Sequence, residues 1–203
     1  MQNGSWVEFR NTTGTFSTGI YEYYNFTMTR RTQASGNVNS MLDWTQDNPP
    51  LKNYCYCKMF NGCRSLTQAP ELPATTLGRY CYGNMFYGCT SLTQAPELPA
   101  TTLTDGCYET MFYGCTSLTT APELPATTLA SECYSYMFFG CSKIDHILWK
   151  SKTIPSSTYC DNWLNGVSAS GTFEYLWPLL DVASITRTSS GVPEGWSIQQ
   201  LKP

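Results

Sequence analysis

The sequence predicts an α/β repeat solenoid with one short helix and one short strand in each repeat. The main observation is the stretch Cys81–Gly106, which the next stretch of equal length, 107–132, repeats with only six differences. A looser copy, 55–80, precedes it, and a fourth copy, 133–159, follows. Self-similarity at a period of this length is the sequence signature of a solenoid, because one repeat cannot bury its apolar face alone.

The first part of each repeat predicts the helix. In CYGNMFYGC, Cys81, Met85 and Cys89 are spaced by four, which places them on one face of a helix. Gly88 stands where the end of a helix favours a residue in the left-handed region. Since the other copies carry the same residues, Cys, Met, Phe and Leu side chains are expected to form buried columns along the stack.

The second part of each repeat predicts a strand and a turn. SLTQA reads as a short strand, with Leu92 and Ala95 directed to the interior. PELPATTL then holds two prolines three residues apart, which excludes a helix and removes two donors from any strand ladder. This segment is therefore expected to be an extended, turn-like return to the next helix.

The flanks of the array predict β caps at both ends. Residues 1–54 lie outside the period, and WVEFRN, GIYEYYNFTMTR and GNVNSMLDW are typical of short strands. Residues 160–203 hold a partial repeat, CDNWLNGVS, followed by a tail that also predicts strands. A cap is needed because the outermost repeats would otherwise expose their apolar edges. The array between the caps, 55–159, divides into the repeats 55–80, 81–106, 107–132 and 133–159.

The repeated motif CxSLTxAPELPATTLxxxCYxxMFYGC resembles the BspA-type leucine-rich repeat family, in its proline-containing variety with a repeat of this length. The flanking segments ASGNVNSML, WLNGVSASGTF (Trp163 to Phe173) and GVPEGWS (Gly191 to Ser197) also resemble that family. The resemblance implies a short leucine-rich-repeat-like array on a bacterial cell surface. It also implies adhesion or the binding of proteins and matrix as the function.

Composition excludes two classes of function. The net charge is −3, and the twelve Lys and Arg residues are scattered, whereas a nucleic-acid-binding protein shows a basic stripe. The apolar runs are far shorter than the ~18 residues that span a bilayer. The first residues, MQNGSWVEFRN, lack the pattern of a signal peptide. The resemblance implies an extracellular or cell-surface location, and the missing signal-peptide pattern makes a virion the alternative.

The ten cysteines are expected to be buried thiols, since most of them occupy two columns of the array. Disulfides between neighbouring repeats are an alternative, because stacked residues about 5 Å apart are within reach of such a bond. Cys55, Cys57 and Cys63 are close in sequence, but the second ligand pair typical of a zinc site is missing. Cys57 lies outside both columns and is the candidate reactive thiol. No metal and no cofactor are predicted.

Carboxylates form a third column, at Glu71, Glu97 and Glu123. Like charges about one strand spacing apart repel each other, so the column must be well solvated or bridged by a cation such as calcium. A solvated edge is the simpler interpretation, because calcium prefers ligands that converge from several directions.

Tyrosines supply the candidate binding surface. Rigid aromatic side chains with a polar tip are favoured in binding surfaces, although these rings could instead cover the helices and stack on one another. Positions that differ between the repeats are expected to be exposed and to contribute specificity. The candidate residues are Tyr82, Tyr108, Tyr134, Tyr87, Tyr113, Asn84, Glu109, Thr110 and Tyr136. On this hypothesis Tyr108→Ala should leave the chain folded.

The predicted function is that of a non-enzymatic binding or adhesion scaffold, which displays an aromatic- and Thr-rich surface to a protein or glycan. The alternative is a structural or receptor-binding component of a larger particle, such as a phage fibre or decoration protein. A third hypothesis is an enzyme or metalloprotein that uses the Cys55–Cys63 cluster. Catalysis finds little support, because His146 is the only histidine and no catalytic motif is present.

Overall fold

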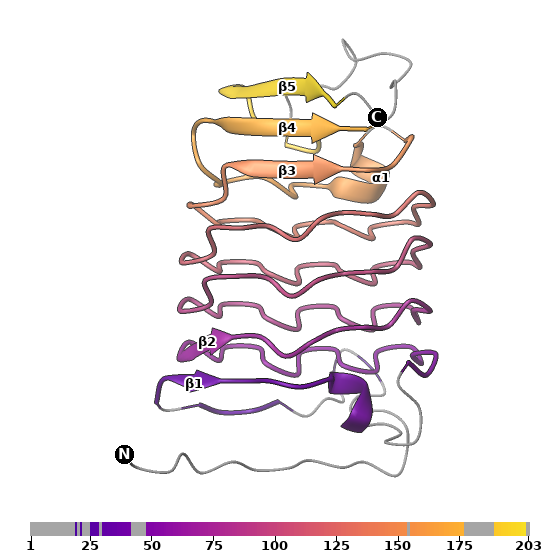
Figure 1. Ribbon diagram of the computed structural model, residues 1–203, viewed down its shortest axis with the longest axis vertical. Coiled ribbons are helices and arrows are strands. Elements are labelled where there is room, and N and C mark those ends of the chain that lie inside the picture. The colour runs from indigo at the N-terminus through magenta and orange to yellow at the C-terminus, as the bar shows by residue number, and fades with distance from the viewer. Residues whose placement is uncertain are drawn as a thin grey trace.

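In the computed structural model the chain coils into a stack, and segments one repeat apart in the sequence lie next to each other (Figure 1). Backbone hydrogen bonds join the coils: Tyr82 N–H donates to the Cys107 carbonyl at 3.0 Å, and Tyr108 N–H to the Cys133 carbonyl at 3.2 Å. We call each coil a rung. Its turn side is the segment from the Cys-Tyr pair to the next cysteine, 55–63 in the first rung, and the strand side follows. The structure describes residues 19, 21, 25–28, 30–41, 48–153, 155–176 and 189–201.

The turn side is a series of tight turns that are hydrogen-bonded to the next rung. Residues at alternate positions donate their N–H groups to carbonyls of the following rung, and the residues between them donate within their own rung. Met59 N–H, for example, donates to Tyr56 three residues earlier, at 3.2 Å. An α-helix would instead join residues four apart. The donors to the second rung are Tyr54, Tyr56, Lys58, Phe60 and Gly62.

Backbone conformation explains why the helix predicted here is wrong. Every fourth residue of the turn side has a positive φ, such as 56° at Asn84 and 68° at Gly88. An α-helix holds φ near −63° throughout and cannot contain these residues. The left-handed conformation predicted for Gly88 is confirmed, but it belongs to a turn. A turn period of four is close to the helical period of 3.6, so the spacing of the cysteines and methionine cannot distinguish the two.

The strand side forms regular sheet only near the two ends of the stack. Strand β1 (Thr32–Gln33) pairs in parallel with β2 (Leu66–Gln68). The next rungs have isolated bridges, such as Gln94 with Thr120, and their prolines supply no N–H to a ladder. Where PELP is absent, β3 (His146–Trp149), β4 (Gly171–Tyr175) and β5 (Trp196–Gln200) form a three-stranded parallel sheet.

The predicted α/β solenoid, with a leucine-rich-type helix and strand in every rung, is therefore wrong. Within the described residues the one α-helix is α1 (Ser157–Cys160), and the strands belong to two small parallel sheets. Most of the chain between 48 and 153 is turn and extended backbone. On the turn side the backbone donors bond alternately to the next rung and within their own rung, so the stack does not need regular secondary structure in each one.

The N-terminal part continues the stack, and in the residues that the structure describes there the predicted strands do not form. Phe26 N–H donates to the Met59 carbonyl at 2.9 Å, and the rings of Phe26 and Phe60 are stacked with centroids 5.2 Å apart. Residues 25–28 nevertheless form no strand. The segment GNVNSMLDW, which was predicted to be a strand, contains the 3-10 helix η1 (Val38–Met41). The strand predicted at WVEFRN lies outside the described residues. In the tail, β4 and β5 confirm two of the predicted strands.

The core consists of columns of identical side chains, as the sequence predicted. The methionine of each turn side is fully buried, and so is the residue at the Leu66 position in every rung, including Ile144. Phenylalanine rings of adjacent rungs are stacked with centroids 5.5 to 5.7 Å apart and nearly parallel planes. These rings form one column, which comprises Phe60, Phe86, Phe112 and Phe138.

The core column yields a test of the packing. Met111→Asp is expected to unfold the chain, because it places an uncompensated charge among buried apolar side chains, at a cost of several kcal/mol. Thr101→Asp is the matched control, since the Thr101 side chain is exposed and a surface change alters stability by about 0.5 kcal/mol or less. Circular dichroism and urea unfolding measure both. A Met111→Asp variant as stable as the control would contradict the assignment of this column to the core.

Candidate binding surface

Three of the predicted binding residues are core residues. Tyr82, Tyr108 and Tyr134 are each 1% exposed, and adjacent rings are stacked with centroids 5.9 and 6.0 Å apart. They cannot contact a partner in the folded chain, so their assignment to a binding surface is wrong. The alternative, in which the rings stack on one another, is the arrangement observed. The expectation that Tyr108→Ala leaves the fold intact is also revised, because deleting a buried aromatic ring costs about 3–5 kcal/mol.

The hydroxyl groups of the buried tyrosines differ in their hydrogen bonding. The hydroxyl of Tyr56, in the first rung, donates to the Val38 carbonyl at 3.0 Å and thereby links the turn side to η1. The hydroxyl of Tyr82, one rung later, is buried and has no hydrogen-bond partner among the described residues. A buried hydroxyl without a partner destabilises the folded state. The same residue therefore contributes differently in the two rungs.

This difference predicts opposite effects of one substitution. Tyr56→Phe removes the hydrogen bond to Val38 and should lower the free energy of unfolding by about 1–3 kcal/mol, since the carbonyl loses its donor. Tyr82→Phe removes an unpartnered hydroxyl and should leave stability unchanged or raise it by up to about 1 kcal/mol. Urea unfolding of the two single variants measures the difference. Equal losses of stability in both would contradict this account.

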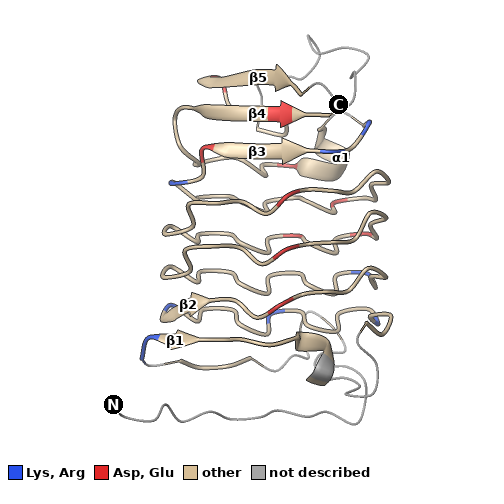
Figure 2. Ribbon diagram, viewed as in Figure 1, with Lys and Arg blue, Asp and Glu red and all other residues tan. Residues whose placement is uncertain are grey.

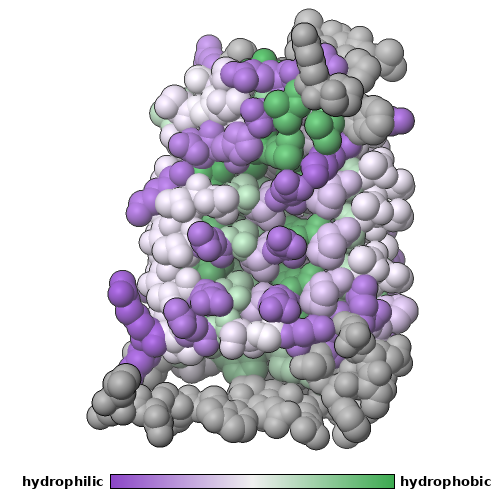
Figure 3. Space-filling model, in the orientation of Figure 1, coloured by the Kyte–Doolittle hydropathy of each residue, from purple (hydrophilic) through white to green (hydrophobic). Residues whose placement is uncertain are grey.

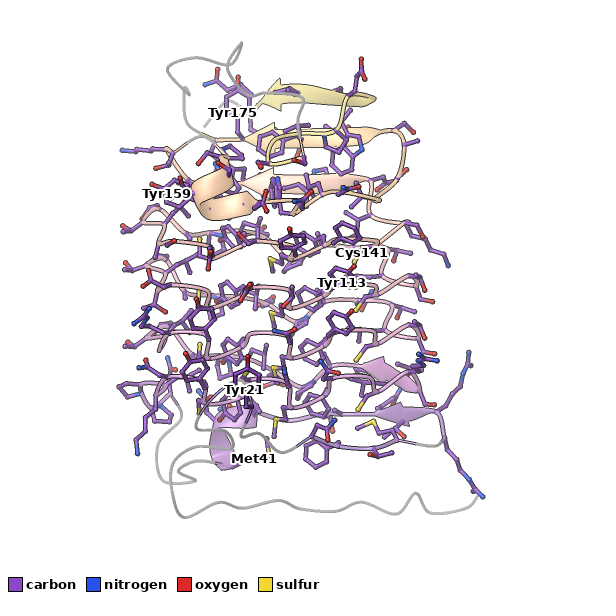
Figure 4. All side chains as sticks on the ribbon, turned by 180° about the vertical axis from the view of Figure 1, so that it is seen from behind. Tyr21, Met41, Tyr113, Cys141, Tyr159 and Tyr175 are labelled. Carbon is purple, nitrogen blue, oxygen red and sulfur yellow. The ribbon has the colours of Figure 1, made fainter. Side chains whose placement is uncertain are left out.

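A second column of aromatic rings lies on the surface of the turn side. Tyr87, Tyr113 and Phe139 are stacked with centroids 4.7 Å apart at both steps and interplanar angles of 9° and 5°. Tyr87 is 37% exposed, and the other two are half-buried. Figure 4, which views the stack from behind, shows Tyr113 on this side of a rung. We call these three residues the exposed ladder. Because each ring covers its neighbour's face, the ladder presents ring edges to solvent.

Polar residues and glycines border the exposed ladder. Asn84, Thr110 and Tyr136 lie three residues before the rings, with φ values of 56°, 52° and 55°. These positive φ values turn the chain, so that the half-buried side chains of this column stay at the surface of the turn side. The Tyr136 hydroxyl accepts a hydrogen bond from Asn162 Nδ2 at 3.2 Å. On the other flank, a Cβ placed at Gly88 would meet nothing within 4 Å, so the ladder is open there.

Charges on the turn side, and on the few residues that lead into it, are separated along the stack. Counted with the turn side that each leads into or belongs to, Lys52, Lys58 and Arg79 fall in the first two rungs, whereas the charged residues on the later turn sides are all acidic. We call these sets the basic half and the acidic half. Figure 2 shows acidic and basic positions in both the lower and the upper part of the stack, so the separation holds for the turn side alone and not for the whole of each rung. The acidic half comprises Asp105, Glu109, Glu132 and Asp161.

Two of these charged side chains, Asp105 and Glu132, make polar contacts with side chains that lead into the turn side. At the boundary of the two halves Arg79 Nε lies 3.3 Å from Asp105 Oδ2, and both side chains are largely exposed. Within the acidic half, the Tyr80 hydroxyl lies 3.4 Å from Glu132 Oε2 and donates to it. Burial, and then the charge of Glu132, raise the pKa of the predicted site residue Glu109. The turn side of the later rungs therefore carries negative charges and no Lys or Arg of its own.

The cysteines are free and buried, and the environment does not favour reactivity. Burial raises the pKa of Cys57 to about 11, so the prediction that Cys57 is a reactive thiol is wrong. In the cysteine column that ends each turn side, Cys89 Sγ donates to the Phe60 carbonyl at 3.1 Å, and Cys115 Sγ donates to the Phe86 carbonyl at 3.1 Å. Among the described residues, no group of three or more His, Cys, Asp or Glu side chains is placed to hold a metal ion. The Cys55–Cys63 cluster thus has no geometric support as a zinc site.

Raised thiol pKa values predict a loss of stability at alkaline pH. Burial raises the pKa from the usual 9.0 to about 11 for Cys63 and to about 12 for Cys141. In the unfolded chain these thiols ionise near pH 9, whereas in the folded chain they stay protonated. The free energy of unfolding should therefore be insensitive to these groups below pH 8 and should fall as the pH rises from 9 toward 11.

Urea unfolding at pH 7.5, 9 and 10.5 measures this loss, and labelling with a thiol reagent at pH 8 in the presence and absence of denaturant gives the control. We expect the native chain to label slowly and the denatured chain to label fully. Rapid labelling of native thiols would show that the columns are accessible and would contradict the burial argument.

The strand side carries polar columns that form no evident site. Hydrophilic residues recur from rung to rung on this face (Figure 3). Glu71, Glu97 and Glu123 are exposed, and Lys150 forms an ion pair with Glu123. The one histidine, His146, contacts Glu174 at 2.9 Å on the exposed surface of β3 and β4. A histidine and a carboxylate alone do not form a catalytic triad, which also needs a nucleophile held against the imidazole.

Comparison of the chain with protein-family models, with curated proteins and with solved structures finds no match in any of the three. The resemblance to BspA-type repeats therefore stays a prediction. No helix in the described part of the chain is long and apolar enough to cross a membrane.

Proposed function

We propose that this protein is a non-enzymatic binding scaffold whose working surface is the turn side around the exposed ladder. The observation that carries the proposal is the ladder itself. Tyr87, Tyr113 and Phe139 hold stacked aromatic rings at the surface, with a spacing of 4.7 Å. Exposed aromatic side chains that are already ordered are well suited to binding, because little side-chain entropy is lost when a partner covers them.

The geometry of the ladder favours a protein over a glycan as the partner. A sugar ring stacks on the face of an aromatic ring, and the faces within this ladder are covered by neighbouring rings. The exposed ring edges and the two tyrosine hydroxyls suit apolar side chains and hydrogen-bonding groups of a protein. The charged residues of the turn side would restrict which proteins can bind.

The test is a binding screen of the purified chain against arrays of proteins, extracellular-matrix components and glycans. We expect a protein ligand whose affinity falls at least tenfold in the Tyr87→Ser/Tyr113→Ser variant, because central aromatic residues of an interface contribute about 2 kcal/mol or more. The matched control is Gln94→Ala/Thr120→Ala, which alters an exposed column on the strand side of the same two rungs.

Circular dichroism and urea unfolding establish that both variants are folded. A ligand that binds the tyrosine variant as tightly as the wild type would show that another surface is used. A ligand lost equally in the control variant would place the working surface on the strand side. Either result would overturn the proposal.

A further inference from the structure

The turn side has a charge pattern that is complementary to itself. The basic half, at Lys52, Lys58 and Arg79, precedes the acidic half along the stack, and the exposed ladder crosses the boundary. The ion pair of Arg79 and Asp105 marks that boundary between the second and third rungs. A surface of this kind fits its own copy when the two stacks run in opposite directions. In that arrangement every basic rung faces an acidic one.

We propose that the partner of the exposed ladder is a second copy of this chain, bound turn side to turn side with the two stacks antiparallel. This inference rests on the proposed function, since it assigns a partner to the same surface. The two-fold axis runs along the rungs and passes between the second and third rungs. Such a dimer has one patch that is complementary to itself, the usual form of a two-fold interface.

The register of the rungs fixes which residues would meet. Equivalent residues lie one repeat apart, so an axis between the second and third rungs brings each column opposite itself in reversed order. Tyr87 of one copy faces Tyr113 of the other, and Arg79 faces Asp105, each contact occurring twice. One rung further out, the rung that carries Lys52 and Lys58 faces the rung that carries Glu132. In this antiparallel arrangement no residue of the turn side faces an equivalent position with the same charge.

The parallel arrangement is disfavoured by the same residues. A two-fold axis along the stack would place each rung against the same rung of the other copy. The basic rungs would then face basic rungs and the acidic rungs would face acidic rungs, and like charges set against each other are unfavourable in an interface. Glu109 and Glu132 already lie close enough that the charge of Glu132 raises the pKa of Glu109. Cations from a second copy would relieve this repulsion, whereas a second acidic half would add to it.

Matching periods allow the aromatic contacts to stay in register. Both copies have the same spacing between rungs, so ring edges of one ladder can lie between those of the other over several rungs. The glycine column beside the ladder leaves room for this approach, because a Cβ at Gly88 would meet nothing within 4 Å. The face is small, since five rungs at about 4.8 Å extend only about 20 Å. We therefore expect weak association, with a dissociation constant on the order of 1–100 μM.

The experiment is analytical ultracentrifugation of the full chain between 1 and 500 μM, at 50 mM and 500 mM NaCl. The wild type should convert from monomer to dimer, and higher salt should weaken the dimer at least threefold. Arg79→Glu alone and Asp105→Arg alone should each weaken it at least tenfold, because each sets like charges against one another at both symmetric contacts. Both residues are exposed, and loss of their intramolecular pair alters folding by about 1 kcal/mol at most.

Mixing the two single variants tests the antiparallel geometry directly. A heterodimer of Arg79→Glu with Asp105→Arg has opposite charges at both contacts, so the mixture should associate as tightly as the wild type. A monomer at every concentration, or a dimer that neither single variant weakens, would overturn the inference. Failure of the mixture to associate would overturn the arrangement. A wild-type monomer that binds a ligand through Tyr87 and Tyr113 would leave the proposed function standing and remove only the second copy.

Discussion

The rung-to-rung hydrogen bonds of the turn side are the constraint on which the rest of the structure depends. In each of the four repeats, alternate N–H groups from the position of Tyr54 to that of Gly62 donate to carbonyls of the next rung. Buried backbone donors must be paired, and here every second one is paired with the next rung and the others within their own turns. The chain can therefore use positive φ values and tight turns that would break a helix. It also follows that each rung must hold the same register as its neighbours.

That register explains the columns of identical side chains. A residue stacked on a copy of itself has a neighbour of the right size and shape, as the parallel rings of Phe86 and Phe112 show. The prolines have the opposite effect on the other side of the rung, where they remove donors and leave isolated bridges such as Thr102 with Thr128. Cohesion in the middle rungs thus comes mainly from the turn side and the core. The ordered sheet of β3, β4 and β5 occurs where the prolines are lost.

The sequence could predict the register and the core but not the backbone conformation. The period of the repeat identifies which residues stack, and Met111 and Leu118 are buried as expected. The helix was wrong because Cys, Met and Cys four residues apart satisfy a series of four-residue turns as well as a helix. Only the conformation of non-glycine residues such as Asn84 and Thr110 distinguishes the two. Asn is a residue type that tolerates a positive φ, but the β-branched Thr110 at the same position gives no such signal.

The same lack of information about the backbone explains why the buried and exposed tyrosines could not be told apart from the sequence. Tyr108 and Tyr113 are five residues apart in the same rung and chemically alike, yet one is buried and the other belongs to the exposed ladder. Residues five apart on a helix also lie about 140° apart around its axis, so the spacing separates the two rings but does not say which one faces the core. That assignment required the turn geometry. The separation of charge, in contrast, was readable from the sequence by following the variable positions along the period, from Arg79 to Asp105 to Glu132. Because stacking fixes where each of these positions lies, substitutions there can change the partner of the turn side without disturbing the core.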